Sequence, residues 1–139
     1  MLFNILLQMK NNFFNAFTIL IVEDDPINYF LLKEIISSFG SRHIWAKDGV
    51  EALNILIGHE KISLILMDID MPQMDGITAT RIIRKKNINI PIIFQSAYIS
   101  EENIKQCFIA GGNEFLSKPL DRDKVNRTIQ KYLVKNLIL

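Results

Sequence analysis

The stretch LILMDIDMPQMDG, residues 64–76, decides the fold. It continues an apolar run that is broken only by Ser63 and that stops at Asp68. Such a run predicts a strand buried on both faces, as in a parallel sheet covered by helices on both sides. Pro72 and Gly76 then break the chain before a helix. A carboxylate at the carboxyl end of such a strand lies where open α/β folds bind ligands, so Asp68 marks a candidate site.

The composition favours one globular domain. The chain has 139 residues, enough for one domain with a core but too few for two ordinary ones, and 49% of them are hydrophobic. A net charge of +1 argues against binding nucleic acid or a membrane by bulk electrostatics. No apolar run reaches the roughly 18 residues that a membrane span needs. The single cysteine excludes an internal disulfide and fits a reducing compartment, so we expect a cytoplasmic protein.

Apolar segments alternate with helical patterns along the chain. The predicted strands cover residues 18–22, 43–46, 62–68, 91–97 and 113–117, and the predicted helices cover 26–39, 48–57, 77–86, 100–110 and a segment from 121 onward. This alternation, with right-handed crossovers, predicts a parallel, doubly wound α/β sheet with helices on both faces. Among the helical residues expected to face the core are Ile27, Ile57 and Phe108.

Residues 1–17 stand apart from this pattern. They are apolar and rich in asparagine, carry one charge, Lys10, and lack the basic region and cleavage site of a signal peptide. An extra helix or arm is expected, with one apolar stripe formed by Leu2, Ile5, Leu6 and Met9. We therefore divide the chain into an N-terminal extension, 1–17, and a domain, 18–139. The stripe and the apolar tail 137–139 leave open the possibility of a homodimer that shares them. Residues 1–17 could alternatively be a linker from a longer parent protein.

Polar and charged side chains gather at one edge of the predicted sheet. The carboxyl ends of parallel strands meet there and carry Glu23, Asp24, Asp68, Ser96 and Lys118. Three carboxylates repel one another, and Lys118 with one divalent cation would balance their charge. Oxygen ligands suit Mg²⁺ better than zinc, for which the chain offers no Cys/His set. Asp68 could then attack phosphorus in line to give an aspartyl phosphate, with Lys118, Ser96 and Mg²⁺ neutralising the phosphoryl oxygens.

This constellation resembles the receiver domain of two-component response regulators, and the Glu-Asp acid pair is more typical of receivers attached to hybrid histidine kinases. The resemblance covers about residues 18–135 and rests on Glu23-Asp24, the segment 67–76, Ser96-Ala97 and the segment 115–119. It implies a flavodoxin-like, five-stranded parallel sheet of order 2-1-3-4-5. It also implies that a histidine kinase or histidine phosphotransfer protein phosphorylates Asp68 from a phosphohistidine. The implied Mg²⁺ ligands are Glu23, Asp24, Asp68 and the backbone carbonyl of Asp70.

The resemblance further implies a switch. In the family, the hydroxyl at Ser96 couples to an aromatic residue at Phe115, and phosphorylation alters the surface of helix 100–110, strand 113–117 and the last helix. A downstream protein reads that surface. Asp70 and Tyr98 flank the site and are candidates for tuning access of water to the phosphoryl group. The implied activity is signalling, in which the chain catalyses its own phosphorylation and dephosphorylation rather than acting as an enzyme on other substrates.

Two alternatives use the same residues. Asp68-Ile-Asp70 imitates the nucleophile motif of small haloacid-dehalogenase-type phosphohydrolases. In that class, however, the metal-binding acids follow the downstream lysine, whereas here the acid pair precedes the nucleophile, which favours the receiver. A degenerate receiver that only binds partners is disfavoured because every charged position is filled. Away from the edge, Cys107 is expected in the core, and His43 and His59 are expected to be structural or exposed rather than functional. The basic segment 81–86 is expected to be a solvated helix end, with a partner-docking patch as the alternative.

Overall fold

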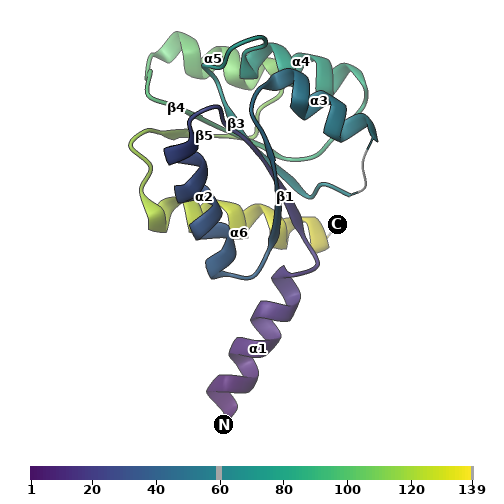
Figure 1. Ribbon diagram of the computed structural model, residues 1–139, viewed down its shortest axis with the longest axis vertical. Helices are drawn as coiled ribbons and strands as arrows, with labels where there is room; N and C mark the ends of the chain where they lie inside the picture. The colour runs from purple at the N-terminus through teal and green to yellow at the C-terminus, as the bar shows by residue number, and fades with distance from the viewer. Residues whose placement is uncertain (59–60, 139) are drawn as a thin grey trace.

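Five parallel strands form one sheet in the order β2-β1-β3-β4-β5, which confirms the predicted fold class. The computed structural model describes residues 1–58 and 61–138. The strands are β1 (Thr18–Val22), β2 (Arg42–Ala46), β3 (Leu64–Asp68), β4 (Ile92–Ser96) and β5 (Glu114–Ser117). The helices are α1 (Leu2–Phe14), α2 (Pro26–Ser38), α3 (Gly49–Gly58), α4 (Gly76–Lys85), α5 (Glu101–Ala110) and α6 (Arg122–Ile138). In Figure 1, α3, α4 and α5 lie on one side of the sheet, and α2 and α6 lie on the other.

The central strands are buried on both faces, as their apolar runs predict. Every residue of β3 and β4 is buried. Leu32 of α2 and Ile129 of α6 belong to the hydrophobic cluster on one face of the sheet. Ile83 of α4 and Cys107 of α5 belong to the cluster on the other face. Helices on both faces hold the strands rigidly, so the side chains that follow each strand are precisely positioned.

Three apolar residues predicted to face the core are exposed instead: Ile27, Ile57 and Phe108. Ile27 lies in the first turn of α2 and is 78% exposed, whereas Tyr29 and Leu32 of the same helix are buried. These three helices carry apolar residues on more than one side, and single exposed apolar residues are common at protein surfaces. The prediction was wrong because contact with the sheet, rather than spacing alone, selects the buried face.

The prediction that segment 81–86 is a solvated helix end is wrong for Arg84. Its guanidinium makes four hydrogen bonds of 2.7–3.0 Å, to the carbonyl oxygens of Ile88, Ile90 and Gly111 and to the side-chain oxygen of Asn113. These partners lie in the segments before β4 and after α5. Arg84 therefore ties the end of α4 to the loops that flank β4, while its neighbours Lys85 and Lys86 are exposed.

The structural roles predicted for two other residues are confirmed. Cys107 is buried in the core. His43 is partly buried, and its Nε2 atom lies 3.1 Å from the hydroxyl of Tyr29. His59 and the side chains of residues 137–139 fall outside the described residues.

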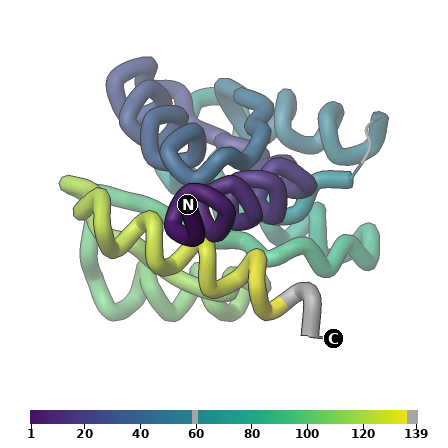
Figure 2. The backbone as a smooth tube through the Cα atoms, turned by 90° about the horizontal axis from the view of Figure 1, so that it is seen from below, coloured from purple at the N-terminus to yellow at the C-terminus, as the bar shows by residue number. Residues whose placement is uncertain are grey.

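The N-terminal extension forms the expected helix, α1, which is anchored near its C-terminal end. The ring of Phe14 is buried with its centroid 5.3 Å from that of Phe39, and Ser41 Oγ donates a 2.8 Å hydrogen bond to the Phe14 carbonyl. The rest of α1 projects from the body in Figure 1 and lies in front of it in Figure 2. The predicted apolar stripe is exposed: Leu2, Ile5, Leu6 and Met9. Among the described residues, no helix is long and apolar enough to cross a bilayer.

Candidate functional site

The predicted site residues lie at the carboxyl edge of the sheet. Glu23 and Asp24 follow β1, Asp68 is the last residue of β3, Ser96 is the last residue of β4, and Lys118 follows β5. Because the strands are parallel, one edge carries all five side chains. Glu23 and Asp68 are buried, and Asp68 is only 3% exposed.

Three carboxylates converge at this edge. Glu23, Asp24 and Asp68 each offer a carboxylate oxygen, and these atoms lie within 4.8 Å of one another. Lys118 Nζ lies 3.1 Å from Glu23 Oε2 and 3.3 Å from Asp68 Oδ1. When all are ionised, one lysine leaves two negative charges of the three uncompensated. A converging set of carboxylate oxygens without nitrogen or sulfur donors fits a hard divalent cation, of which Mg²⁺ is the ordinary choice.

Burial and charge change the proton affinities within this cluster. Burial, reinforced by the negative charge of Glu23, raises the pKa of Asp68 from 3.8 to about 7, against the opposing effect of Lys118. Burial by itself would lower the pKa of Lys118, but the charges of Asp68 and Glu23 outweigh it and raise that pKa. A further positive charge close to Asp68 would therefore strongly favour the ionised form of its carboxylate.

Ser96 lies beside the acidic cluster but bonds to a different carboxylate. Its hydroxyl donates to Asp70 Oδ2 at 3.3 Å and accepts from the backbone N–H of Tyr98 at 3.0 Å. Tyr98 is 67% exposed, and it contacts Ser96 through its backbone. Phe115 is partly buried against the hydrophobic cluster on the α3–α5 side of the sheet. The structure thus links Ser96 to both residues proposed for tuning, Asp70 and Tyr98.

Two residues at this site escaped the sequence analysis. Gln95 is buried, and its Nε2 donates to Glu23 Oε2 at 3.3 Å. Trp45 Nε1 donates a 2.8 Å hydrogen bond to the carbonyl oxygen of Glu23. A signal for Gln95 was present in the sequence, because a glutamine directly follows three apolar residues of a predicted buried strand. Trp45 gave none, since its partner is a backbone atom.

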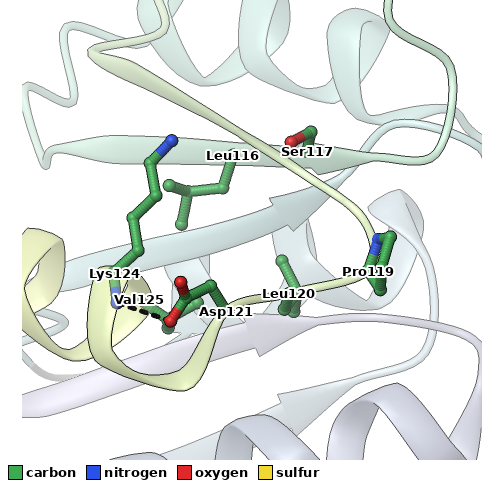
Figure 3. A pocket seen from close by; sticks show the side chains of 7 residues that line it. All are labelled: Leu116, Ser117, Pro119, Leu120, Asp121, Lys124 and Val125. Carbon is green, nitrogen blue, oxygen red and sulfur yellow. Dashed lines mark hydrogen bonds between the residues drawn. The ribbon is translucent and has the colours of Figure 1, made fainter.

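A pocket separate from the acidic cluster is lined by residues that flank Lys118 in the sequence. Figure 3 shows its lining between β5 and the start of α6, formed by Leu116, Ser117, Pro119, Leu120, Asp121, Lys124 and Val125. The dashed line in the figure is the hydrogen bond from the Lys124 backbone N–H to Asp121 Oδ1. None of these lining residues belongs to the cluster, so the pocket does not enlarge the candidate site.

The model of the response regulator receiver domain family matches residues 19–130, so the chain belongs to that family. Sensor histidine kinase RcsC of Escherichia coli (strain K12) is 38% identical over 114 residues, 82% of this chain and 12% of that protein. Osmosensing histidine protein kinase SLN1 of Saccharomyces cerevisiae is 34% identical over 120 residues, 82% of this chain and 10% of that protein. The chain thus spans about a tenth of the length of these relatives.

Solved structures agree with this assignment. The Francisella response regulator 1452 receiver domain superposes with a TM-score of 0.78 at 32% identity, covering 86% of this chain and 98% of that one. The receiver domain of sensor histidine kinase PA1611 from Pseudomonas aeruginosa gives a TM-score of 0.75 at 33% identity, covering 84% and 96%. That structure is described with a magnesium ion coordinated in its active site cleft. The chain is a receiver domain of two-component signalling, and the phosphohydrolase alternative is not supported.

Proposed function

We propose that Asp68 accepts a phosphoryl group from the phosphohistidine of a histidine kinase or histidine phosphotransfer protein. One observation carries this proposal: Asp68, buried at the end of β3, shares Lys118 with Glu23 in a cluster of three carboxylates. The histidine kinases among the relatives support the class of phosphodonor. The single Cys107, unpaired and buried, supports a cytoplasmic location.

The proposed reaction uses the residues as they lie. A carboxylate oxygen of Asp68 attacks phosphorus as the bond from phosphorus to the histidine nitrogen breaks. The electron pair of that bond stays on the nitrogen, which takes up a proton, and Asp68 becomes an acyl phosphate. Lys118 Nζ, 3.3 Å from Asp68 Oδ1, is close enough to donate to a phosphoryl oxygen. A Mg²⁺ ion held by Glu23, Asp24, Asp68 and the Asp70 carbonyl would supply further charge neutralisation.

The same residues support a switch and a limited lifetime for the product. Ser96 would exchange its 3.3 Å bond to Asp70 for a bond to a phosphoryl oxygen. Phe115, partly buried on the neighbouring strand, would follow and alter the surface formed by α5, β5 and α6. Asp70, released from Ser96, would then influence how readily water hydrolyses the acyl phosphate. The partner that reads this surface is proposed to be a protein.

Intact-mass measurement after incubation with acetyl phosphate tests the proposal. The wild-type chain should gain one phosphoryl group in the presence of Mg²⁺ and none with EDTA. Asp68→Asn should gain none, because the amide is not a nucleophile. Asp70→Asn, the same change two residues away, should still accept the group but alter the half-life of the adduct. Adduct formation by Asp68→Asn would refute the acceptor assignment, and an unchanged half-life would remove the tuning role of Asp70.

We also propose that residues 18–139 form the receiver unit and that residues 1–17 are an extension that pairs two copies of the chain. The family match, which begins at residue 19, supports the boundary. Helix α1 exposes several large apolar side chains: Leu2, Phe3, Ile5, Leu6, Leu7 and Met9. A second copy is favoured because the polar side of α1 consists of amides, without the Lys and Arg residues by which interfacial helices bind membranes. Lys10 is the single charged side chain of this helix, so pairing opposes few like charges.

Molar mass in solution tests the pairing. Because Phe14 is buried against the core, a substitution near the exposed end is a cleaner test than deleting residues 1–17. We expect light scattering to give the mass of a dimer for the wild type and of a monomer for Leu6→Glu. Phe30→Glu, the same change at an exposed position of α2, should remain dimeric. A wild-type chain that stays monomeric at high concentration would exclude the pairing.

A further inference from the structure

Gln95 occupies the strand position beside the proposed phosphoacceptor. In the parallel pairing of β3 with β4, Asp68 and Gln95 are register partners, so their side chains lie side by side on the same face of the sheet. Gln95 is 1% exposed and follows Ile92, Ile93 and Phe94, all fully buried. A buried amide without hydrogen-bond partners would cost free energy, so the contacts of this side chain are informative.

Those contacts lead to Glu23. The Nε2 of Gln95 donates to Glu23 Oε2 at 3.3 Å, and Lys118 Nζ donates to the same oxygen at 3.1 Å. The other oxygen, Oε1, accepts from the backbone N–H of Asp25 at 3.2 Å. Glu23 is itself fully buried, and three donors from three different segments therefore fix its carboxylate.

We propose that Gln95 is a positioning residue that holds Glu23 in place for the cation and leaves Lys118 free for the phosphoryl group. This inference rests on the proposed function. When Lys118 turns to a phosphoryl oxygen, Glu23 Oε2 loses the lysine as a hydrogen-bond donor. The Gln95 amide then remains to donate to this oxygen. The amide is suited to this task because it donates without carrying a charge. A lysine or arginine there would repel the cation, and an apolar residue would leave Oε2 without a hydrogen-bond donor once Lys118 had moved.

Gln95→Met separates positioning from space filling. Methionine is similar to glutamine in length and volume but has no N–H to donate. Gln95→Asn is the second variant: it keeps the amide, but its side chain is one methylene shorter and falls out of reach of Glu23. The matched control is Tyr132→Phe, which removes a hydroxyl that donates to Asn113 O and Glu114 Oε2 in a partly buried location on α6.

The readout is Mg²⁺ affinity, followed through the fluorescence of Trp45. This is the only tryptophan of the chain, and its Nε1 donates to the Glu23 carbonyl at 2.8 Å, so its emission should respond when Glu23 takes up a cation. We expect both Gln95 variants to bind Mg²⁺ about tenfold more weakly, the size of effect found when residues that orient a metal ligand are removed. The rate of adduct formation at saturating Mg²⁺ should also fall. Tyr132→Phe should leave the affinity and the rate unchanged.

The outcomes are distinct. If Gln95→Met binds Mg²⁺ with the dissociation constant of the wild type, the inference is overturned and the proposed function stays intact. If Gln95→Met does not fold, the same result for Gln95→Asn overturns the inference. If Tyr132→Phe also binds Mg²⁺ more weakly, the inference is overturned, because the weaker binding of the Gln95 variants would then reflect a general loss of stability. A wild-type chain that neither binds Mg²⁺ nor forms the adduct overturns the proposed function, and the inference with it.

Discussion

Replacing Gly76 with alanine should lower the free energy of unfolding by about 3 kcal/mol, at the upper end of what overpacking costs. A Cβ atom at this position would lie 2.1 Å from the carbonyl oxygen of Asp68 and 2.8 Å from Met67 Cγ. The first contact is with backbone, so no side-chain rotation relieves it. Either α4 must move away or the segment after β3, which holds Asp68, must shift. Urea denaturation followed by circular dichroism measures the loss.

Gly58→Ala is the matched control. Gly58 is the last residue of α3, and a Cβ atom built there meets nothing within 4 Å. Alanine has the higher helix propensity, so this variant should be unchanged or more stable by about 0.5 kcal/mol. Equal stability for Gly76→Ala and Gly58→Ala would show that α4 does not approach the β3 segment as closely as described.

Gly76 also shows what a sequence can and cannot predict. Glycine after a strand and before a helix predicts a break in the chain, and α4 does begin there. The physical need for glycine is different: it is the close approach of a helix to a carbonyl oxygen, which depends on packing between elements. The central strands β3 and β4 were predicted well because a strand buried on both faces must be largely apolar. The edge that gathers Asp68 and Lys118 followed from parallel topology alone.

Interactions with backbone atoms account for much of what was missed. Arg84 looks like any basic residue at a helix end, yet three of its four acceptors are carbonyl oxygens, which every residue type carries. Trp45 likewise bonds to a backbone carbonyl. Gln95 differs, because its partner is the side chain of Glu23, which follows another strand, β1, and only the sheet order brings the two together. Helix faces such as that of Ile27 were mispredicted because apolar residues lie on several sides.

Asp68→Asn should make the chain more stable by about 2 kcal/mol at pH 7.5 in EDTA, while abolishing its function as an acceptor. The pKa of Asp68 is raised from 3.8 to about 7, first by burial and then by the charge of Glu23. Between these two values the folded chain binds more protons than the unfolded chain, so this group's contribution to stability falls as pH rises. The stabilising contribution of Asp68 is fully present below about pH 4 and is lost as the pH rises through about 7. Three pKa units correspond to about 4 kcal/mol, and we expect roughly half because the variant also deprives Lys118 of a charged partner.

Urea titrations at several pH values between 4.5 and 8 measure the effect. The stability difference between Asp68→Asn and wild type should grow with pH across this range, since the amide does not ionise. Saturating Mg²⁺ should narrow the difference, because a ligand that binds the folded wild-type site stabilises it. Asp123→Asn, the same change at an exposed position in the first turn of α6, should stay within about 0.5 kcal/mol of wild type throughout. A variant less stable than wild type at pH 7.5 would mean that Lys118 compensates Asp68 fully. Charge repulsion would then not be what prepares this edge of the sheet to bind a cation.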